Sequence, residues 1–438
     1  MRNIKLRMAA LLTLALGGIP FAASAETWTL SQCVDYAIAH NIDIRRMALQ
    51  ADEGELAVVE AKDAFLPQLD ASASQSFSFG RGLTAENVYA NRNTASTQWG
   101  VNFSLPLFQG MREYRRLKVA ELSLQQTLLE CGSARDNVTL NVMSQYLQVL
   151  YCKEVAASAR SQAEYSAFEV ERQRALVEAG KVAEATLYDV EALAAQDRLQ
   201  VVTADNDIRI ALVNLANMLQ LPSAEGFDVA PFDEATPPLP DAESVFTSAE
   251  AVNHSLLSAA QGLKVAEGNI SLAKAGFIPT LSFSGGLGSS YYKLSGVPNA
   301  GFGTQMRNNY STYLGFSLRI PLFDAFSTRN QVRRAKVQRL NAELQYEQRR
   351  SDLHKEIELA YCQAKGARER LLTSRETLEK SRLSFTATQE RFNLGRATIA
   401  DFEQAKNNLF RTEVTGIQAL YEYLLRVKVL RFYQSNAL

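Results

Sequence analysis

The sequence has few of the residues on which enzymes and metal proteins most often depend. It contains three histidines and four cysteines in 438 residues, and neither type occurs at spacings that hold a metal ion. His40, His254 and His354 lie in helical segments without a serine, aspartate or metal-ligand partner at a recognisable spacing. The sequence therefore predicts no catalytic residue, no metal site and no cofactor, and we expect a protein that is not an enzyme.

The chain also lacks a strong net charge and long hydrophobic runs. The formal net charge is −1, so no basic surface for nucleic acid is indicated and no nucleic-acid partner is expected. After residue 25 no apolar run reaches the roughly 18 residues of a membrane-spanning helix. A hydrophobic content of 47% with 21% charged residues is nevertheless enough to build a core, so disorder is not expected.

The N-terminus has the pattern of an export signal. Arg2, Lys5 and Arg7 precede an apolar stretch from Met8 to about Leu16, and an Ala-Ser-Ala sequence ends at Ala25. This arrangement predicts a secretory signal peptide over residues 1–25, because the apolar stretch is too short for a membrane anchor. An exported chain without an inner-membrane helix is periplasmic, outer-membrane or secreted.

The four cysteines leave two questions open. Cys33, Cys131, Cys152 and Cys362 could form disulfides in an oxidising compartment, although helix packing by small side chains is the favoured interpretation. The stretch Leu-Ser-Gln-Cys that ends at Cys33 resembles a lipid-attachment site. It lies beyond the predicted cleavage site and within a helical pattern, so we expect no lipid there.

The chain contains an internal duplication. The stretch AKDAFLPQL (61–69) recurs as AKAGFIPTL (273–281), and RALVEAGKVAEATL (174–187) aligns with QERFNLGRATIADF (389–402), 215 residues later. Such ordered landmarks at a nearly constant spacing indicate two copies of one unit. The predicted divisions are a signal peptide (1–25), a first repeat (26–220), a Pro-rich linker (221–244) and a second repeat (245–438).

Each repeat has the pattern of a helix, two strands and a long helical hairpin. The strands follow from strict alternation of apolar and polar residues, and the hairpins follow from long helical stretches without proline. The predicted ranges are helix 31–66, strands 68–80 and 97–105 and hairpin 109–220, then helix 245–278, strands 280–292 and 310–320 and hairpin 324–436.

The four predicted strands suit a membrane barrel. Each is about ten residues long with one apolar face and one face of serine, asparagine and glycine, which is typical of strands that cross an outer membrane. A soluble sandwich is the alternative, but the small polar face would make a poor core. Four strands cannot close a barrel, two chains give a barrel filled by side chains, and three chains give twelve strands with a lumen. Transport therefore requires at least a trimer.

The long helical segments carry a seven-residue apolar repeat. Such a repeat imposes left-handed supercoiling, which predicts coiled-coil hairpins that turn near Gly180 and Gly395. Small residues follow three positions after most members of the repeat. The repeat in the second copy consists of Ile357, Ala364, Leu371, Leu378, Phe385 and Phe392.

Together these features resemble the TolC-like outer-membrane efflux protein family over essentially the whole mature chain. The most typical stretches are SLPLF (104–108), RIPLFD (319–324) and RFNLGRATIADFEQA (391–405). The resemblance implies an α+β membrane protein that forms a homotrimer. A 12-strand transmembrane β-barrel in outer-membrane lipid, with four strands per chain, would continue into a long α-helical coiled-coil periplasmic tunnel.

The resemblance also implies partners and a site. The channel would belong to a tripartite efflux or type I secretion system, with a periplasmic adaptor (a membrane fusion protein) and an inner-membrane transporter of the RND or ABC type. The hairpin turns at Gly180, Lys181, Gly395 and Arg396 would meet the adaptor. Pro106 and Pro321 would mark the joints between barrel and helices.

The gate residues that the resemblance implies match the family only in part. Phe392 occupies the position of an aromatic residue, commonly tyrosine, and Gln404 the position of an aspartate further into the pore. Thr186 replaces an acidic residue, with Asp189 nearby. We therefore hypothesise that inter-helix ion pairs hold the tip closed, formed by Arg391, Arg396, Asp401 and Glu403.

A periplasmic coiled-coil adaptor or scaffold is the alternative function, and the four alternating strands argue against it because an adaptor has no lipid-facing band. The sequence leaves the transported substrate, the class of pump and the resting state of the tip open.

Overall fold

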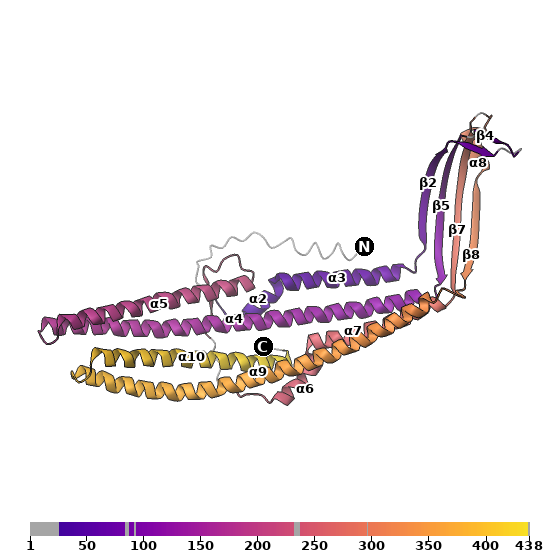
Figure 1. Ribbon diagram of the computed structural model, residues 1–438. Coiled ribbons are helices and arrows are strands. Elements are labelled where there is room, and N and C mark those ends of the chain that lie inside the picture. The colour runs from indigo at the N-terminus through magenta and orange to yellow at the C-terminus, as the bar shows by residue number, and fades with distance from the viewer. Residues whose placement is uncertain (1–25, 84–86, 92, 232–236, 296, 437–438) are drawn as a thin grey trace.

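The chain is a long rod of helices with a curved four-stranded sheet at one end (Figure 1). This computed structural model describes residues 26–83, 87–91, 93–231, 237–295 and 297–436. The predicted signal peptide lies outside the described residues. Among the residues described, none of the helices combines the length and the hydropathy needed to cross a membrane.

The sheet is antiparallel and contains two strands from each repeat. Its order is β2-β5-β7-β8, where the strands are β2 (Gln68–Ser78), β5 (Thr94–Phe108), β7 (Thr280–Leu294) and β8 (Ser311–Arg319). Short elements follow at its far end, namely the small strands β3 (Arg81–Leu83) and β4 (Tyr89–Asn91) and the helix α8 (Phe302–Asn308). Helix α8 lies between the predicted strands 280–292 and 310–320, where the sequence analysis predicted neither a helix nor a strand.

The register of the strands gathers their apolar residues on one face. Phe283 pairs with Leu105 on one side and Phe316 on the other, and Leu69 pairs with Phe103. Since paired residues point to the same face of a sheet, the four apolar faces predicted separately form one continuous surface. The opposite face is small and polar, and one of its rows consists of Ser72, Gly100, Gly288 and Ser311.

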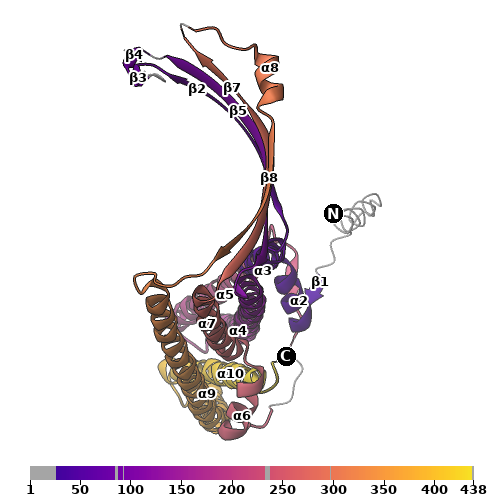
Figure 2. The same ribbon diagram turned by 90° about the vertical axis from the view of Figure 1, so that its right-hand side faces the viewer.

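Glycines in β7 allow the sheet to curve. A Cβ atom at Gly285 would lie 2.4 Å from the ring of Phe103, and one at Gly288 would lie 2.5 Å from the carbonyl oxygen of Trp99. Larger side chains at these positions would hold the strands apart, whereas glycine permits a close and bent approach. Figure 2 shows the resulting curvature of all four strands.

Two helical hairpins form most of the rod. They are α4 (Arg112–Glu178) with α5 (Glu184–Met218), and α9 (Ser327–Asn393) with α10 (Ile399–Ser435). Helices α4 and α9 have 67 residues each, which corresponds to about 100 Å. The first residue of α9 follows the first residue of α4 by 215 positions, and the last residues differ by the same number. The duplication found in the sequence is therefore also a repeat of structure.

Four shorter helices lie at the sheet end of the rod and beside it. They are α2 (Leu30–His40), α3 (Ile42–Asp63), α6 (Ala242–Val252) and α7 (His254–Lys274). The sequence predicted one helix in each repeat here, but Asn41 and Asn253 interrupt it with extended backbone. Their side chains accept hydrogen bonds from the first turn of the following helix, at 2.9 Å from the amide of Asp43 and 3.0 Å from that of Leu256. Asparagine is a preferred residue at this capping position, which explains the breaks.

The N-terminal segment is fixed to the middle of the rod. Strand β1 (Glu26–Trp28) pairs in parallel with β6 (Phe227–Val229), which lies in the predicted Pro-rich linker. The hydroxyl of Tyr146 in α4 donates a hydrogen bond of 2.7 Å to the carbonyl of Ala230. This contact anchors the connection between the repeats on the first long helix.

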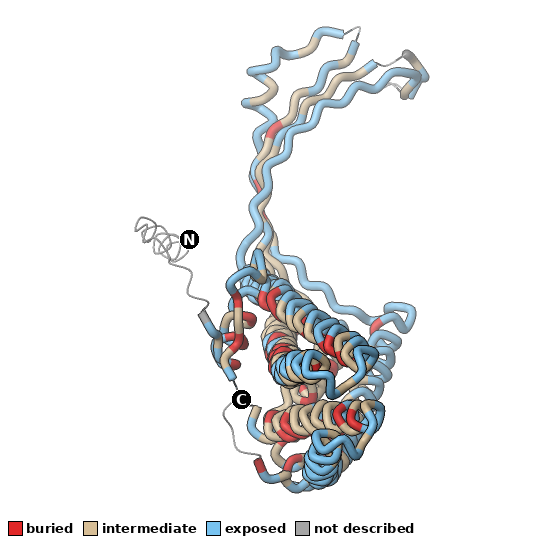
Figure 3. Tube along the Cα trace, turned by 90° about the vertical axis from the view of Figure 1, so that its left-hand side faces the viewer, coloured by how far each residue is buried: buried red, intermediate tan, exposed pale blue. Residues whose placement is uncertain are grey.

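The seven-residue pattern is the buried seam of each hairpin (Figure 3). Positions that match at a spacing of 215 are buried in both copies, so both hairpins pack in the same way. The α4 set is Val142, Val149, Cys152, Ala156, Ala159 and Ser166, and the α9 set is Ile357, Ala364, Ala367, Leu371, Ser374 and Ser381.

All four cysteines are free, and three of them are buried. Cys33 is 0% exposed in the core around α2 and α4, and burial raises the pKa of its thiol to about 12. Helix packing is therefore the role of Cys33, Cys131 and Cys152, as the sequence favoured. Cys362 is exposed on α9.

The helices nearest the sheet form a layer with two open sides. Helix α3 packs on α4, α4 on α7, and α7 on α9. This order matches the order of the strands, so α3 lies below the edge strand β2, and α9 lies below the edge strand β8.

Candidate functional site

The hairpin turns at the far end of the rod have the same backbone in both copies. Gly180 and Gly395 have φ values of +70° and +66°. The amide of Lys181 donates to the carbonyl of Leu176 at 2.9 Å, and that of Arg396 donates to Arg391 at 2.8 Å. Left-handed glycine with this closing bond is a common helix C-terminus, so the sequence placed both tips correctly.

The two tips differ in how the return helix begins. At α10 the hydroxyl of Thr398 accepts a hydrogen bond from the amide of Asp401, while the carboxylate of Asp401 accepts one from the amide of Thr398. Hydrogen bonds from Thr398, assisted by nearby Arg391, lower the pKa of Asp401 below its usual value. Helix α5 begins after Ala183 without a side-chain cap. The second tip is therefore the more firmly capped.

An aromatic cluster lies behind the second tip. Phe402 is 3% exposed and stacks on Phe392, with ring centroids 4.8 Å apart. The ring centroids of Phe385 and Tyr165 lie 5.7 Å and 6.2 Å from that of Phe402. Tyr165 belongs to α4, so the cluster joins the two hairpins. Burial, and then the negative charge of Glu169, raises the pKa of the Tyr165 hydroxyl.

A buried ionic cluster lies next to these rings. Lys406 of α10 is 5% exposed, and its Nζ lies 2.8 Å from Asp197 of α5, 3.0 Å from Glu403 and 3.1 Å from Ser166 of α4. The hydroxyl of Ser166 also donates to Asp197, and Gln162 donates to Asp197 at 2.7 Å. A buried cation with hydrogen-bonded partners on three helices fixes how those helices fit together.

Glu403 is the weak member of this cluster. Burial raises the pKa of its carboxyl, and Asp197 adds to the shift, while the hydrogen bond from Lys406 opposes it. Two carboxylates share one lysine, so the second acidic charge is only partly compensated. The negative charge on Glu403 is therefore less favourable in the folded chain than in water.

The ion pairs in the structure involve other partners than the four charged residues named from the sequence. Asp401 accepts a hydrogen bond from Thr398, the N-cap of α10, and Glu403 pairs with Lys406 of α10. Both acids are therefore bonded to residues of their own helix or its cap. Lys406 with Asp197 is an ion pair that joins the two hairpins, and Arg174 pairs with Glu191 between α4 and α5 at 3.1 Å. Arg391 and Arg396 are exposed at the tip. Of the remaining predicted site residues, Gly180, Lys181, Asp189, Gly395 and Gln404 are exposed, and Thr186 is half-buried.

Lys406, Asp197 and Ser166 were not singled out from the sequence. One signal was present, because Asp197 follows Ala194 by three residues and so falls in the buried row of α5 that also holds Val190 and Ala204. A charge in such a row needs a partner. Only the structure shows that the partner comes from the other hairpin.

The joints between sheet and rod lie slightly beyond the predicted prolines. Pro106 is inside β5, where it pairs with Ser282, and Pro321 follows the end of β8 by two residues. The chain turns at pairs of left-handed residues, Gly110–Met111 with φ of 60° and 63° and Ala325–Phe326 with 52° and 62°. These pairs are again 215 residues apart. A Cβ atom at Gly110 would lie 2.7 Å from Ile278, which explains glycine in the first copy.

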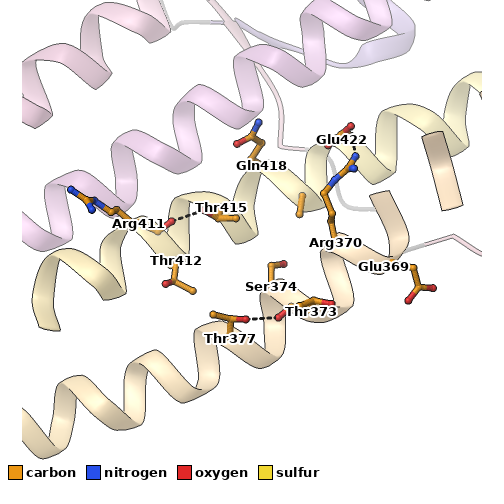
Figure 4. A pocket seen from close by; sticks show the side chains of 11 residues that line it. Glu369, Arg370, Thr373, Ser374, Thr377, Arg411, Thr412, Thr415, Gln418 and Glu422 are labelled. Carbon is orange, nitrogen blue, oxygen red and sulfur yellow. Dashed lines mark hydrogen bonds and ion pairs between the residues drawn. The ribbon is translucent and has the colours of Figure 1, made fainter. Parts of the chain in front are cut away.

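A groove with a volume of about 580 Å³ lies between α9 and α10, nearer to the tip than to the sheet. Hydroxyl groups line its centre, and charged residues lie at its two ends (Figure 4). Arg370 pairs with Glu422 at 2.6 Å at one end, and Arg411 lies at the other. The central residues are Thr373, Ser374, Thr377, Thr412 and Thr415.

Comparison with known proteins agrees with this architecture. The sequence model of the outer membrane efflux protein family matches residues 33–220 and 245–433, one segment in each repeat. The chain belongs to the outer membrane efflux protein family. Its similarity to the outer membrane protein TolC of Vibrio cholerae is 23% identity over 422 residues, which covers 95% of this chain and 92% of that protein.

Solved structures share the fold. The crystal structure of CusC, described as forming a transmembrane channel, has a TM-score of 0.75 at 16% identity, with 92% of this chain and 91% of that chain covered. The open state of the MtrE outer membrane channel of Neisseria gonorrhoeae has a TM-score of 0.72 at 17% identity, with coverages of 92% and 88%. The predicted family, outer-membrane location and channel function are confirmed by the family match, and the periplasmic adaptor is not favoured. The family is one of transport proteins.

Proposed function

We propose that three copies of this chain form one channel, which conducts substrates passively across the periplasm and the outer membrane and closes at the hairpin tips. It would work in a tripartite efflux or type I secretion system with a periplasmic adaptor and an inner-membrane transporter of the RND or ABC type. The observation that carries this proposal is the sheet with one apolar face and two open edges, mounted on a helical layer in the same order.

The apolar face has the height of a lipid bilayer. From Leu281 to Tyr291 β7 advances ten residues, or about 33 Å at roughly 3.3 Å per residue. A strand tilt near 40° reduces this to about 25 Å along the membrane normal, the height of the apolar band of outer-membrane barrels. The exposed apolar side chains of this face, such as Leu314 at 68% and Phe316 at 71%, then contact lipid.

The two edges of the sheet provide the contacts that close a barrel. Within the described residues, β2 pairs only with β5, and β8 pairs only with β7. Unpaired edges are unfavourable in lipid, where no water satisfies the backbone. Pairing β8 of one copy with β2 of the next closes a ring, and three copies contribute twelve strands around an open lumen.

The open sides of the helical layer carry matching apolar stripes. On α3, Ile42, Leu49 and Leu56 are spaced by seven residues and are 61–64% exposed. On α9, Val337 and Leu344 are 64% and 63% exposed and also differ by seven residues. Seven-residue spacing on both surfaces is typical of two helices that pack along a common seam. These stripes support packing of α3 on α9 of the next copy.

The tips are the proposed gate, because the aromatic and ionic contacts between the two hairpins concentrate there. Phe392 and the cluster around Lys406 fix the position of the second hairpin against the first. The exposed turns at Gly180–Lys181 and Gly395–Arg396 remain available for the adaptor, as the family resemblance implies.

Fractionation and mass measurement of the detergent-solubilised protein test this function together. We expect the mature chain in the outer membrane, with a mass of three chains and discrete conductance steps in a planar bilayer. A monomer confined to the soluble periplasm would contradict the proposal. If substitutions at tip residues such as Phe392 leave the conductance unchanged, the tips are not the gate, but the channel function still stands.

A further inference from the structure

The polar face of the sheet carries very little charge. In the rows that cross the strands β2, β5, β7 and β8, this face consists mainly of serine, glycine and asparagine. Asp70 belongs to it because it pairs with Asn102, and Arg319 belongs to it because it lies two residues beyond Ser317. Among the described residues of the four strands, no other charged residue lies on this face. One acid and one base therefore face the lumen of the proposed barrel.

Asp70 and Arg319 lie on opposite edge strands of the sheet, both at the end nearest the rod (Figure 1). Both are exposed, and neither has an ion-pair partner in the part of the chain that the structure describes. The side chain of Asn102 donates a hydrogen bond of 3.4 Å to Oδ2 of Asp70 from the neighbouring strand β5. Asn102 in turn accepts a hydrogen bond of 3.4 Å from the hydroxyl of Tyr313. The carboxylate is therefore held from within the sheet and remains available at the open edge of β2.

The duplication predicts strand pairings correctly within the chain. The stretches that start at 61 and 273 place β2 and β7 at an offset of 212, while β5 and β8 differ by 215. The first repeat pairs Gln68 with Ser104. Adding these offsets gives the pair of Thr280 with Arg319, which is the pair that the second repeat contains. The same offsets can therefore be used for the seam between copies.

The pairing of β5 with β7 supplies the register of that seam. Ser104 pairs with Ser284, and their repeat counterparts are Arg319 on β8 and Ser72 on β2. A strand β8 that meets β2 of the next copy in this register places Arg319 opposite Ser72 of that copy. Asp70 follows two residues along the same face, as a diagonal neighbour. Diagonal neighbours lie about 7–8 Å apart, which is within reach of a long side chain.

We propose that Arg319 pairs with Asp70 of the next copy, and that three such pairs form a charge-balanced ring in the lumen at the inner end of the barrel. This inference rests on the proposed trimer and assigns the residues that determine how its barrel discriminates between ions. Rings of charged side chains of one sign make a channel selective. Paired charges cancel this effect, so the barrel passes anionic and cationic solutes alike.

Reversal potentials of the full-length protein in a planar bilayer test the ring. They are measured under a salt gradient near 0.1 M or below, where a charge acts over about 10 Å or more. Asp70→Asn leaves a ring of guanidinium groups and should lower the ratio of cation to anion permeability by about twofold. Arg319→Gln should raise that ratio by a similar factor. An unchanged ratio in both variants overturns the ring.

The apolar face of the sheet offers a matched control for these variants. Lys293 lies on β7 two residues beyond Tyr291, and therefore on the face opposite to the lumen. Lys293→Gln removes one charge from each chain, as Arg319→Gln does, and should leave the permeability ratio unchanged. A shift as large as that of Arg319→Gln would show that the ratio follows net charge alone, and would overturn the assignment to the lumen.

A charge exchange tests whether the two side chains meet. Asp70→Arg and Arg319→Asp each place like charges at the seam, and each should lower the temperature at which the trimer dissociates in detergent. An exposed ion pair contributes little to stability, so we expect both variants to fold. The two exchanges together restore one charge of each sign and should recover most of the loss. Additive losses mean that the residues do not interact, and overturn the pair.

A cysteine pair tests the register separately. Arg319→Cys with Ser72→Cys, in a Cys362→Ser background that removes the exposed thiol, places two Cβ atoms about 4.5–5.5 Å apart. We expect oxidation with copper phenanthroline to convert most of the protein to covalent dimer and trimer. In the control, Leu318→Cys with Ser72→Cys, the thiols point to opposite faces, and we expect a yield that is lower by about tenfold.

The oligomeric state separates failure of the pair from failure of the proposed trimer. A protein with the mass of three chains that cross-links through neither cysteine pair, or better through Leu318→Cys, overturns the register and leaves the channel intact. A monomeric mass overturns the trimer itself.

Discussion

Lys406 is the residue whose replacement tests the coupling of the two hairpins most directly. The substitution Lys406→Met keeps most of the side-chain volume but removes the ammonium group that lies within 3.0 Å of both Asp197 and Glu403. Two buried carboxylates then remain, with Ser166 and Gln162 as neutral donors to one of them. Removing one partner of a buried ion pair costs about 3–5 kcal/mol.

This cost falls on local opening of the tips, because the cluster lies between the two hairpins, next to the contact of Tyr165 with Phe402 behind the second tip. With about 1.4 kcal/mol for each factor of ten, 3 kcal/mol corresponds to roughly a 100-fold larger population of opened tips. Hydrogen exchange of the purified full-length protein measures this population residue by residue. We expect amides near Asp197 and Lys406 to exchange about 100 times faster, with little change near the sheet.

A compensated variant shows whether the buried charge is the cause. Lys406→Met combined with Asp197→Asn and Glu403→Gln leaves no uncompensated charge in the cluster. Replacing a buried ion pair by neutral groups of similar size is often close to neutral in stability, so exchange should return to within about tenfold of the natural protein. Normal exchange in Lys406→Met alone, or equal loss in both variants, would refute the assigned role of the cluster.

Three further predictions concern single features. Glu403→Gln should raise the melting temperature at pH 8 and have little effect at pH 4. The reason is that a carboxyl whose pKa is raised by folding lowers stability only as the pH rises from its pKa in the unfolded chain through its pKa in the folded chain. An equal change in melting temperature at both pH values would contradict this. Gly395→Ala should destabilise the second tip by about 1–2 kcal/mol, because φ there is +66°, seen as faster proteolysis at the turn than in Gly416→Ala, which lies within a helix. Ala325→Gly should raise the free energy of unfolding by about 0.5–1 kcal/mol by relieving a left-handed alanine, and a loss of stability in denaturant titration would show that this joint is not strained.

The sequence predicted helices and strands well where a single periodicity of apolar residues runs along the whole segment. Alternation identified the four strands, and their register then placed Leu69, Phe103 and Phe283 on a single face. The seven-residue repeat identified the hairpins, because heptads determine which residues form the seam. Local capping was the main source of error, since Asn41 and Asn253 end helices that the apolar pattern would continue.

The candidate site was harder to predict because its contacts are distant in the sequence. Gly180 and Gly395 were identified from a local rule for helix ends. Lys406 meets Asp197 across 209 residues, and nothing in the local pattern of α10 distinguishes this lysine from solvent-exposed ones. The joints show the same limit, because prolines mark their neighbourhood while the left-handed residues at Met111 and Phe326 follow from how the sheet meets the rod.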